Sequence, residues 1–377
     1  MNLRNVLTVF CSAIAVTIVS CSTGPGTGPA CSLEYAQLLS ITEGNGFKTA
    51  EVSDPWNKGR ILQRYILIPR DACIPEDSIP NGTIVRVPIE NIIVYSSVHA
   101  SILEEMGASG RITGVCEPEY MTCRSVKEGI ASGRIVDCGN SVSPNVERIA
   151  DARGEVIIAS PFENSNYGTA SKLGIPIIEA TDYMENTPLA RSEWIKLFGA
   201  LLCMEDKADS MFLQIETEYN RIRRDIAEGI EEQGLKRPTL IAERKYGSSW
   251  GVPGGKSYIT HIYRDAGADY IFSDIDAENS INMSFESVLT RGIDAEYWVF
   301  KYWNPTPMTY ESLEAEYQLY SKFKAFRERR IFGCNTFEST YYDDIVLRPQ
   351  DILMDLASIF HPELTGDYTR KYFLPLR

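Results

Sequence analysis

Residues 191–232 contain no proline and only two glycines, Gly199 and Gly229. Apolar residues recur through this stretch at helical spacing: Trp194, Leu197, Phe198, Leu201, Met211, Phe212, Ile215, Tyr219, Ile222 and Ile226. The pattern predicts a long helical segment, which Pro238 ends. Because alternating strand and helix signals lie on both sides of it, we expect the segment to bridge two lobes.

Before this segment, short β-branched runs alternate with helix signals, which is typical of a parallel sheet covered on both faces. We expect strands at 89–95, 112–115, 134–137, 155–159 and 177–179, and helices at 100–106, from 143 onward and up to 174. Ser143 would cap the second helix, with Pro144 at its first position. These elements predict one α/β lobe.

After Pro238 the same alternation returns. Strands are expected at 239–243, 297–301 and 331–334, and helices at 258–266, 284–291, 309–329 and 349–360. Residues 31–88 carry short β runs split by proline and glycine, which predict a hairpin added to the first lobe. The predicted fold class is therefore α/β, with two lobes that each have a mostly parallel sheet flanked by helices, joined by one long connecting helix. The predicted boundaries are 1–20 signal peptide, 21–30 tether, 31–88 β extension, 89–188 first lobe, 189–236 connecting segment and 237–377 second lobe.

The first twenty-one residues predict export and a lipid anchor. Arg4 precedes an apolar run too short for a lasting membrane span, and Ile18-Val19-Ser20 leads directly into Cys21. This arrangement resembles the bacterial lipoprotein signal, which is cleaved to leave a lipidated Cys21. The Gly/Pro/Ser/Thr-rich residues 22–30 suit a flexible tether. An ordinary signal peptide, with Cys21 incidental, is the alternative, but we expect a periplasmic protein attached to the membrane through its lipid alone.

The charge excludes some partners. The chain carries a net charge of −14, and removing residues 1–20 takes away Arg4 and no acidic residue. Nucleic acids require a net positive field, so we expect no nucleic-acid partner. The 357 residues left are more than one core normally holds, which agrees with two lobes.

Seven cysteines remain beyond Cys11 and Cys21, an odd number that leaves at least one free or paired between molecules. Cys116 and Cys138 each follow a β-branched run, so they would lie at neighbouring strand ends where a disulfide is geometrically possible. A free pair is equally open. Zinc is disfavoured because Cys116 and Cys123 lack metal-site spacing and the three histidines are far apart.

Two lobes joined by a helix behind a lipoprotein signal resemble the helix-hinged class of ABC-transporter solute-binding proteins, in the family that binds ferric siderophores, haem and cobalamin. The stretches that carry the resemblance lie between Ile89 and Leu364: 94–97, 112–115, 143–149, 155–158, 173–176, 250–255, 267–269, 284–286, 348–349 and 361–364. The extension over 31–88 and the many cysteines resemble lipoproteins of the Bacteroidetes type.

The resemblance implies a monomer that captures a metal chelate between its lobes and delivers it to the membrane subunits of an ABC importer, by a small rocking closure. An iron chelate, either a siderophore or haem, is the first expectation. Cobalamin, or a carrier or sensor without an ABC partner, is the alternative. We expect no catalysis, cofactor or protein-held metal. A thiol enzyme built on Cys116, Cys123 and Cys138 would need a base, and no histidine lies near them in sequence.

Ligand contacts are expected where strands end, because loops and helix N-termini converge there. In the first lobe these positions are Ser96, Ser97, Tyr120, Gly139, Asn140, Ser160, Phe162 and Asn164; in the second they are Arg244, Lys245, Tyr246, Trp250, Trp303, Asn335 and Tyr341. Aromatic planes cover the apolar face of a chelate, and a guanidinium would pair with its oxygens. We therefore predict Tyr120, Phe162, Arg244, Tyr246, Trp250, Trp303 and Tyr341 as ligand-binding residues. For each of these aromatic residues, packing in the core is the alternative. We expect His99 to be a structural hydrogen-bond donor, and an iron ligand is the alternative for it.

Glu147 and Glu286 occupy related places near the start of a helix in each lobe. In the family that the chain resembles, glutamates at these places pair with arginines of the membrane subunits. The alternative is that both complement the positive end of a helix dipole.

Overall fold

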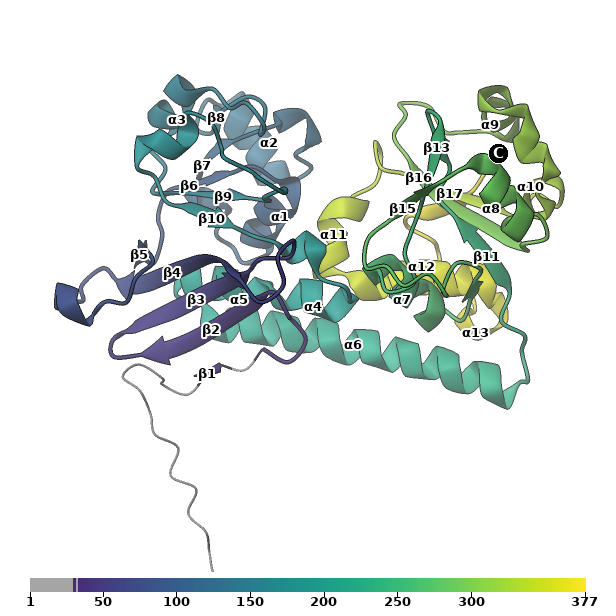
Figure 1. Ribbon diagram of the computed structural model, residues 1–377, viewed down its shortest axis with the longest axis horizontal. Coiled ribbons are helices and arrows are strands. Elements are labelled where there is room, and N and C mark those ends of the chain that lie inside the picture. The colour runs from purple at the N-terminus through teal and green to yellow at the C-terminus, as the bar shows by residue number, and fades with distance from the viewer. Residues whose placement is uncertain (1–29, 32) are drawn as a thin grey trace, which may run out of the picture.

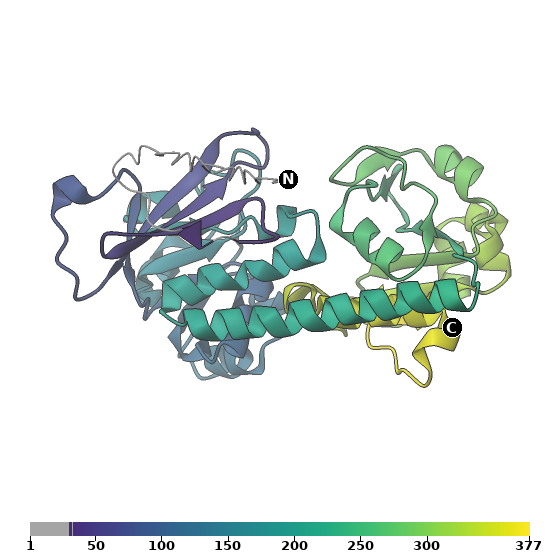
Figure 2. The ribbon, with the colours of Figure 1, turned by 90° about the horizontal axis from the view of Figure 1, so that it is seen from below.

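The computed structural model describes residues 30, 31 and 33–377 and arranges them as two α/β lobes (Figure 1). Helix α6 (Glu205–Glu232) joins the lobes, and Figure 2 shows it running beneath both. The predicted fold class is confirmed. Across the described part of the chain, no helix combines the length and the apolar character needed to cross a membrane. The lipidation site predicted at Cys21 lies outside the described residues.

The first lobe contains a fully parallel sheet in the order β10-β9-β6-β7-β8. Its strands are β6 (Ile92–Val94), β7 (Ile112–Val115), β8 (Val136–Asp137), β9 (Val156–Ala159) and β10 (Ile177–Glu179), and its helices are α1 (Ser97–Glu105), α2 (Arg124–Ala131) and α3 (Val146–Ala152). Every residue of β6 and β9 is buried, as expected for strands covered on both faces. The loops that follow these strands therefore meet at one edge.

The second lobe contains a sheet in the order β14-β11-β16-β17-β18, in which only β18 is antiparallel, and a small antiparallel sheet β12-β13-β15. Its strands are β11 (Thr239–Ala242), β12 (Lys245–Tyr246), β13 (Ser249–Val252), β14 (Asp269–Tyr270), β15 (Ile281–Met283), β16 (Tyr297–Tyr302), β17 (Ile331–Asn335) and β18 (Phe373–Pro375). Its helices are α7 (Tyr258–Asp265), α8 (Phe285–Gly292), α9 (Tyr310–Glu316), α10 (Lys324–Arg327), α11 (Tyr341–Leu347), α12 (Pro349–Phe360) and α13 (Pro362–Thr365).

The continuous helix predicted over 309–329 is wrong. The chain instead forms α9, a 3-10 turn at Gln318–Lys322 and α10, with Tyr317 extended between the first two (φ −161°). Tyr320 and Phe323 are almost fully buried in an aromatic cluster of the second lobe. Packing of these rings overrides the local preference for helix.

The connecting segment is three helices, α4 (Pro188–Glu193), α5 (Ile195–Leu202) and α6. Cys203 adopts a left-handed backbone (φ 54°) and ends α5, so the chain turns before α6 begins. One face of α6 is buried along its length, through Ala208, Phe212, Ile215, Tyr219, Ile222, Ile226 and Ile230. Helix α12 of the second lobe packs against it.

The prediction of a hairpin over 31–88 underestimates the β structure there. These residues form a five-stranded sheet in the order β1-β2-β3-β4-β5, made of β1 (Ala30–Cys31), β2 (Leu39–Gly44), β3 (Phe47–Ser53), β4 (Ile61–Pro69) and β5 (Thr83–Val87). Two buried carboxylates bind residues 34–38, which lead into β2, to the connecting helices α4, α5 and α6, which we call the hinge. Glu193 accepts backbone N–H bonds from residues 34–36, and Glu185 accepts them from residues 37 and 38.

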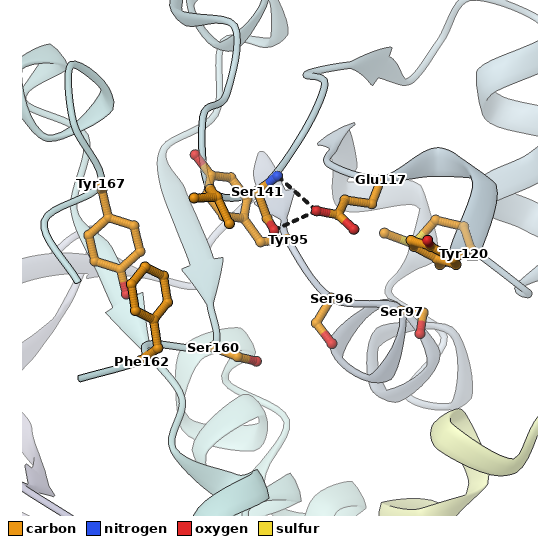
Figure 3. A pocket seen from close by; sticks show the side chains of 11 residues that line it. Tyr95, Ser96, Ser97, Glu117, Tyr120, Ser141, Ser160, Phe162 and Tyr167 are labelled. Atoms are coloured by element: carbon orange, nitrogen blue, oxygen red, sulfur yellow. Dashed lines mark hydrogen bonds between the residues drawn. The ribbon is translucent and has the colours of Figure 1, made fainter. Parts of the chain in front are cut away.

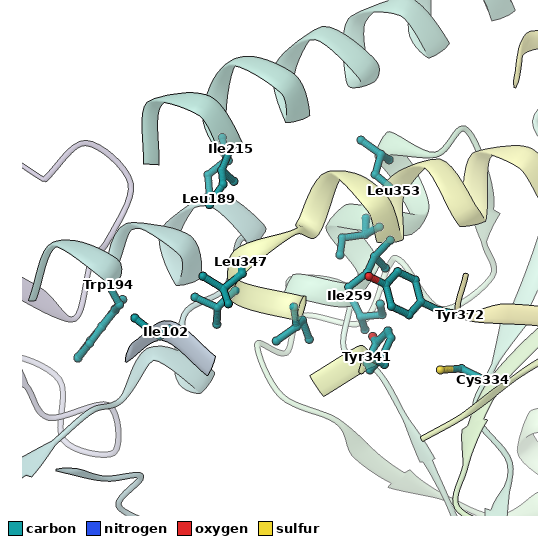
Figure 4. Close-up of a cluster of buried hydrophobic side chains, with 14 of the residues drawn as sticks. Ile102, Leu189, Trp194, Ile215, Ile259, Cys334, Tyr341, Leu347, Leu353 and Tyr372 are labelled. Carbon is teal, nitrogen blue, oxygen red and sulfur yellow. The ribbon is translucent and has the colours of Figure 1, made fainter. Parts of the chain in front are cut away.

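A single apolar cluster runs from the first lobe through the hinge into the second. Figure 4 shows its centre, where Ile102 of α1 and Leu189 of α4 lie near Leu347 of α11, with Ile215 of α6 above. A core continuous between lobes resists wide opening, because separating them would expose close-packed apolar surface.

Cys116 and Cys138 lie side by side, since their predecessors Val115 and Asp137 pair across β7 and β8. Both are fully buried free thiols, so the disulfide that the sequence left open is absent. The Cys138 thiol points toward the carbonyl of Val136 on its own strand, at 3.7 Å. No disulfide joins any cysteines whose side chains the structure describes.

Candidate functional site

A pocket of about 300 Å³ opens at the carboxyl ends of the first lobe's strands (Figure 3). Its lining comes from the loops after four strands: Tyr95, Ser96 and Ser97 after β6; Glu117, Tyr120 and Met121 after β7; Ser141 and Val142 after β8; Ser160, Phe162 and Tyr167 after β9. Parallel strands bring these loops together, although they are up to 72 residues apart in sequence.

Glu117 is the one charged side chain among these lining residues. Its backbone is left-handed (φ 53°) and its N–H donates to Gly139 O at 2.8 Å. One carboxylate oxygen accepts the Ser141 N–H at 3.1 Å and the Ser141 hydroxyl at 2.7 Å, as the dashed lines in Figure 3 mark. The carboxylate is therefore fixed in the pocket wall.

Tyr120 and Phe162 present the large apolar surfaces of the pocket, at 52% and 53% exposure. Tyr183, which precedes the hinge helix α4, donates from its hydroxyl to Pro161 O beside Phe162. Exposed aromatic rings on rigid strand-end loops can cover a flat apolar ligand with little loss of side-chain entropy.

Beneath the pocket lies an apolar layer that contains Tyr95, Cys116 and Cys138. Burial raises the pKa of both thiols, that of Cys138 to about 12, so they stay protonated. The hydroxyl of Tyr95 is buried, and within the described residues it has no hydrogen-bond partner. Burial also raises the pKa of Tyr95 and keeps it a neutral donor.

Five of the first-lobe positions expected from the sequence line the pocket: Ser96, Ser97, Tyr120, Ser160 and Phe162. Gly139, Asn140 and Asn164 are not part of the lining. The sequence reasoning missed Tyr95, Glu117, Met121, Ser141, Val142 and Tyr167. Glu117 and Ser141 could have been found by the same signal, because each lies within four residues of a strand end.

Two second-lobe predictions are corrected. Trp250 is fully buried, stacked on Trp298 with ring centroids 5.5 Å apart, and its indole N–H donates to Ala242 O at 2.9 Å. The segment that the resemblance placed in a loop is strand β13, in which residues 250 and 252 face the core. Tyr341 is also fully buried, and its hydroxyl lies 3.0 Å from that of Tyr258. Neither ring is available to a ligand.

The remaining second-lobe candidates surround the carboxyl ends of β11, β16 and β17. Arg244 forms an ion pair with Glu316 at 2.5 Å. Tyr246 is 86% exposed on the β12–β13 hairpin. Trp303 directly follows β16, is 58% exposed and packs edge-on against Phe337, with centroids 5.1 Å apart. Phe337 was not anticipated, although its place after β17 is the same signal.

His99 is fully buried, 3.1 Å from the Asp182 carboxylate, and its ring lies against Phe198. This contact agrees with the structural reading of His99. Within the described residues no cluster of three or more histidine, cysteine, aspartate or glutamate side chains could hold a metal ion.

Glu147 and Glu286 lie exposed in the first turns of α3 and α8, one in each lobe. Ser284 caps α8, accepting the Ser287 N–H. The cap expected at Ser143 is wrong, because Asn145 caps α3 and Pro144 instead bridges to Gly139. Figure 1 shows α3 near the top of the first lobe and α8 below α9 in the second lobe, with both helices above α6 in this view.

Comparison with known proteins shows which family the chain belongs to. The model of the periplasmic binding protein family matches residues 92–336, which run from β6 to the loop after β17. The chain belongs to this family. An uncharacterized lipoprotein of Methanocaldococcus jannaschii is 27% identical over 365 residues, covering 91% of this chain and 84% of that protein.

Solved structures of binding and transport proteins share the fold. A periplasmic haem-binding protein of Pseudomonas aeruginosa is 15% identical, with a TM-score of 0.56 over 76% of this chain and 96% of its own. An ABC-type Fe³⁺-hydroxamate transport protein of Saccharomonospora viridis is 16% identical, with a TM-score of 0.55 over 73% and 94%.

Proposed function

We propose that this periplasmic binding protein captures an iron chelate, a siderophore or haem, between its two lobes and delivers it to an ABC importer. Membership of the family supports the binding role. Two structural neighbours are described by their haem and Fe³⁺-hydroxamate roles. Cobalamin, carried by the same class of importer, is the second candidate, because it too is a metal macrocycle.

The observation that carries the proposal is the exposed aromatic surface at the strand ends of both lobes. Tyr120 and Phe162 line the first-lobe pocket, and the Trp303–Phe337 pair follows β16 and β17 in the second lobe. All four are about half exposed. A ligand with two apolar faces would cover both surfaces when the lobes approach.

Binding without catalysis is supported by the thiols. Burial raises the pKa of Cys123 and Cys138 to about 12 and raises that of Cys116 as well. A catalytic cysteine needs a lowered pKa and a neighbouring base. The histidine nearest to them in sequence, His99, is bonded to Asp182.

The proposed lipid anchor rests on Cys21 and on the lipoprotein name of the archaeal relative. Cys21→Ser should leave an exported protein that is recovered outside the membrane fraction. Recovery of the variant in the membrane fraction would contradict the anchor. Because no acidic run follows Cys21, we place the protein in the periplasm and expect protection from proteases added to whole cells.

The binding role is tested by absorption spectroscopy and calorimetry of the purified protein. A bound ferric chelate, haem or corrinoid is coloured, so the protein should carry visible absorption as isolated or acquire it on adding one chelate per chain. A panel of haem, hydroxamate, catecholate and corrinoid complexes then names the ligand. If the protein binds no member of the panel, the proposal is contradicted.

A further inference from the structure

The charge of the candidate site restricts its ligand. Among the eleven lining residues of the pocket, Glu117 carries the single charge and no lysine, arginine or histidine is present. Glu117 is half-buried, and only one of its carboxylate oxygens accepts hydrogen bonds from the described residues. The other oxygen is free to accept from a ligand or to face a positive charge.

The cations at the opposing strand ends are already engaged. Arg244 pairs with Glu316, and Lys301 pairs with Glu243. The Lys245 ammonium donates to Gly247 O and lies 4.8 Å from the centre of the Tyr317 ring. An anionic ligand would therefore have to break an ion pair to engage Arg244 or Lys301, or displace Lys245 from Gly247 O.

Arg191, on hinge helix α4, has no carboxylate within ion-pair distance among the described residues. Its guanidinium donates to the carbonyls of Tyr183 and Glu185 and stacks on Tyr258, 3.6 Å from the ring centre. It is thus held in the seam between the hinge and the second lobe, and it is not part of the pocket lining.

We propose that Glu117 selects the ligand by charge, so that the site accepts neutral or cationic metal chelates and rejects anionic ones. This inference rests on the proposed function and narrows it, within the proposed ligands, to chelates without net negative charge. Tricatecholate ferric complexes and haem, with its two propionates, would bring negative charge beside Glu117. Hydroxamate complexes and amide-rich corrinoids lack that charge.

The physical reason is that lobe closure removes water from the cleft and strengthens every charge interaction inside it. A like charge held within several ångströms of a half-buried carboxylate, with no cation among the lining residues of the pocket to offset it, should weaken binding about tenfold or more. The left-handed backbone at Glu117 is a conformation that few non-glycine residues adopt, and it directs the side chain into the pocket wall beside Ser141.

Matched ligands test the proposal on the intact protein. Ferrioxamine B is cationic, its N-acetyl derivative is neutral and its N-succinyl derivative is anionic, while the iron chelate is unchanged. Cyanocobalamin and its monocarboxylate form a second neutral and anionic pair. For whichever scaffold binds, calorimetry should give affinities that fall about tenfold from the neutral to the anionic member.

Glu117→Gln keeps an oxygen for the Ser141 bonds and removes the charge. We expect the variant to lose most of this discrimination, while the exposed neighbour Glu119→Gln retains it. Equal affinity for neutral and anionic members in the wild type, unchanged discrimination in Glu117→Gln, or tight binding of haem or a tricatecholate complex alone would overturn the inference. Failure of every chelate to bind would instead remove the proposed function itself, and the inference with it.

Discussion

Trp250 and Trp303 have the same side chain in opposite environments. Trp250 is enclosed by the rings of Trp298, Phe285, Tyr320 and Phe323. Trp303 is more than half exposed at the end of β16. The first indole is thus part of the second lobe's core, and the second is available to a ligand.

Trp250→Ala should therefore lower the free energy of unfolding by about 3–5 kcal/mol, because it leaves a large cavity in a packed core. Trp303→Ala should change it by less than about 1 kcal/mol. Urea unfolding followed by circular dichroism measures both. A small effect of Trp250→Ala would contradict its placement in the core.

Asp343, on α11, accepts a hydrogen bond from Thr122 of the first lobe and is almost fully buried. Burial raises the pKa of this carboxyl above its ordinary value. The folded protein thus holds the proton more tightly than the unfolded chain, and Asp343 contributes most to stability below its unfolded pKa of about 3.9. That contribution is lost as the pH rises through the raised pKa.

Stability of the wild type relative to Asp343→Asn should consequently fall as the pH rises from the acid range toward neutrality. Thermal unfolding of the two proteins across this range measures the difference. A difference that is constant with pH would show that the Asp343 pKa is not raised.

At the residue level the sequence predicted positions better than environments. Strand-end reasoning found Ser96, Ser160 and Phe162, because parallel strands must end at one edge. It failed for Trp250, because the segment expected to be a loop is strand β13, which pairs with β12 on one side and with the later β15 on the other. Pairings between distant segments are not visible in local sequence.

Helix α4 anchors the N-terminal sheet to the hinge. The buried carboxylate of Glu193 accepts N–H bonds from Glu34 at 2.9 Å and from Tyr35 and Ala36 at 2.8 Å. Lys196 adds an ion pair at 3.4 Å. The sheet is thereby fixed to the element on which the lobes meet.

Glu193→Gln would place amide hydrogens against these N–H donors and leave at least one donor unpaired. We expect a loss of about 1–3 kcal/mol in the free energy of unfolding, together with faster amide hydrogen exchange at residues 34–36. The exposed Glu76→Gln on the same sheet domain should change neither. Unaltered exchange at residues 34–36 in Glu193→Gln would contradict the anchoring role.

The hydrophobic period predicted the strand and helix alternation of both lobes and the helical connecting segment. It did not predict where individual helices end. Helix α5 stops at the left-handed Cys203, and the helix expected over 309–329 breaks at Tyr317, because buried rings on either side require a different path. Local periodicity records which face is buried and does not record such tertiary constraints.

For the whole molecule, the continuous core and the long helix α6 favour a closure in which the lobes rock slightly toward each other while α6 stays rigid. Glu147 and Glu286 are exposed in the first turns of α3 and α8, one on each lobe, and Figure 1 shows both helices above α6. We propose that they meet arginines of the importer, so that both lobes contact it together. The order of lobes and hinge could be predicted from the sequence, whereas the N-terminal sheet, predicted only as a hairpin, has five strands.

The double variant Glu147→Ala with Glu286→Ala should retain ligand affinity and stability but lose uptake in cells, because rim charges control encounter with a partner more than they control the fold. Ligand uptake in a strain carrying only this variant is the measurement. Undiminished uptake would favour a role at the helix dipoles, or a carrier that works without an importer.

The central claim is that the ligand is held by both lobes at once, and calorimetric titration of the identified chelate tests it most directly. Phe162→Ala in the first lobe and Trp303→Ala in the second should each weaken binding about tenfold to thirtyfold, at one ligand per chain, because each removes an aromatic contact from a desolvated site. Wild-type affinity in both variants, or a loss confined to one lobe, would contradict capture between the lobes.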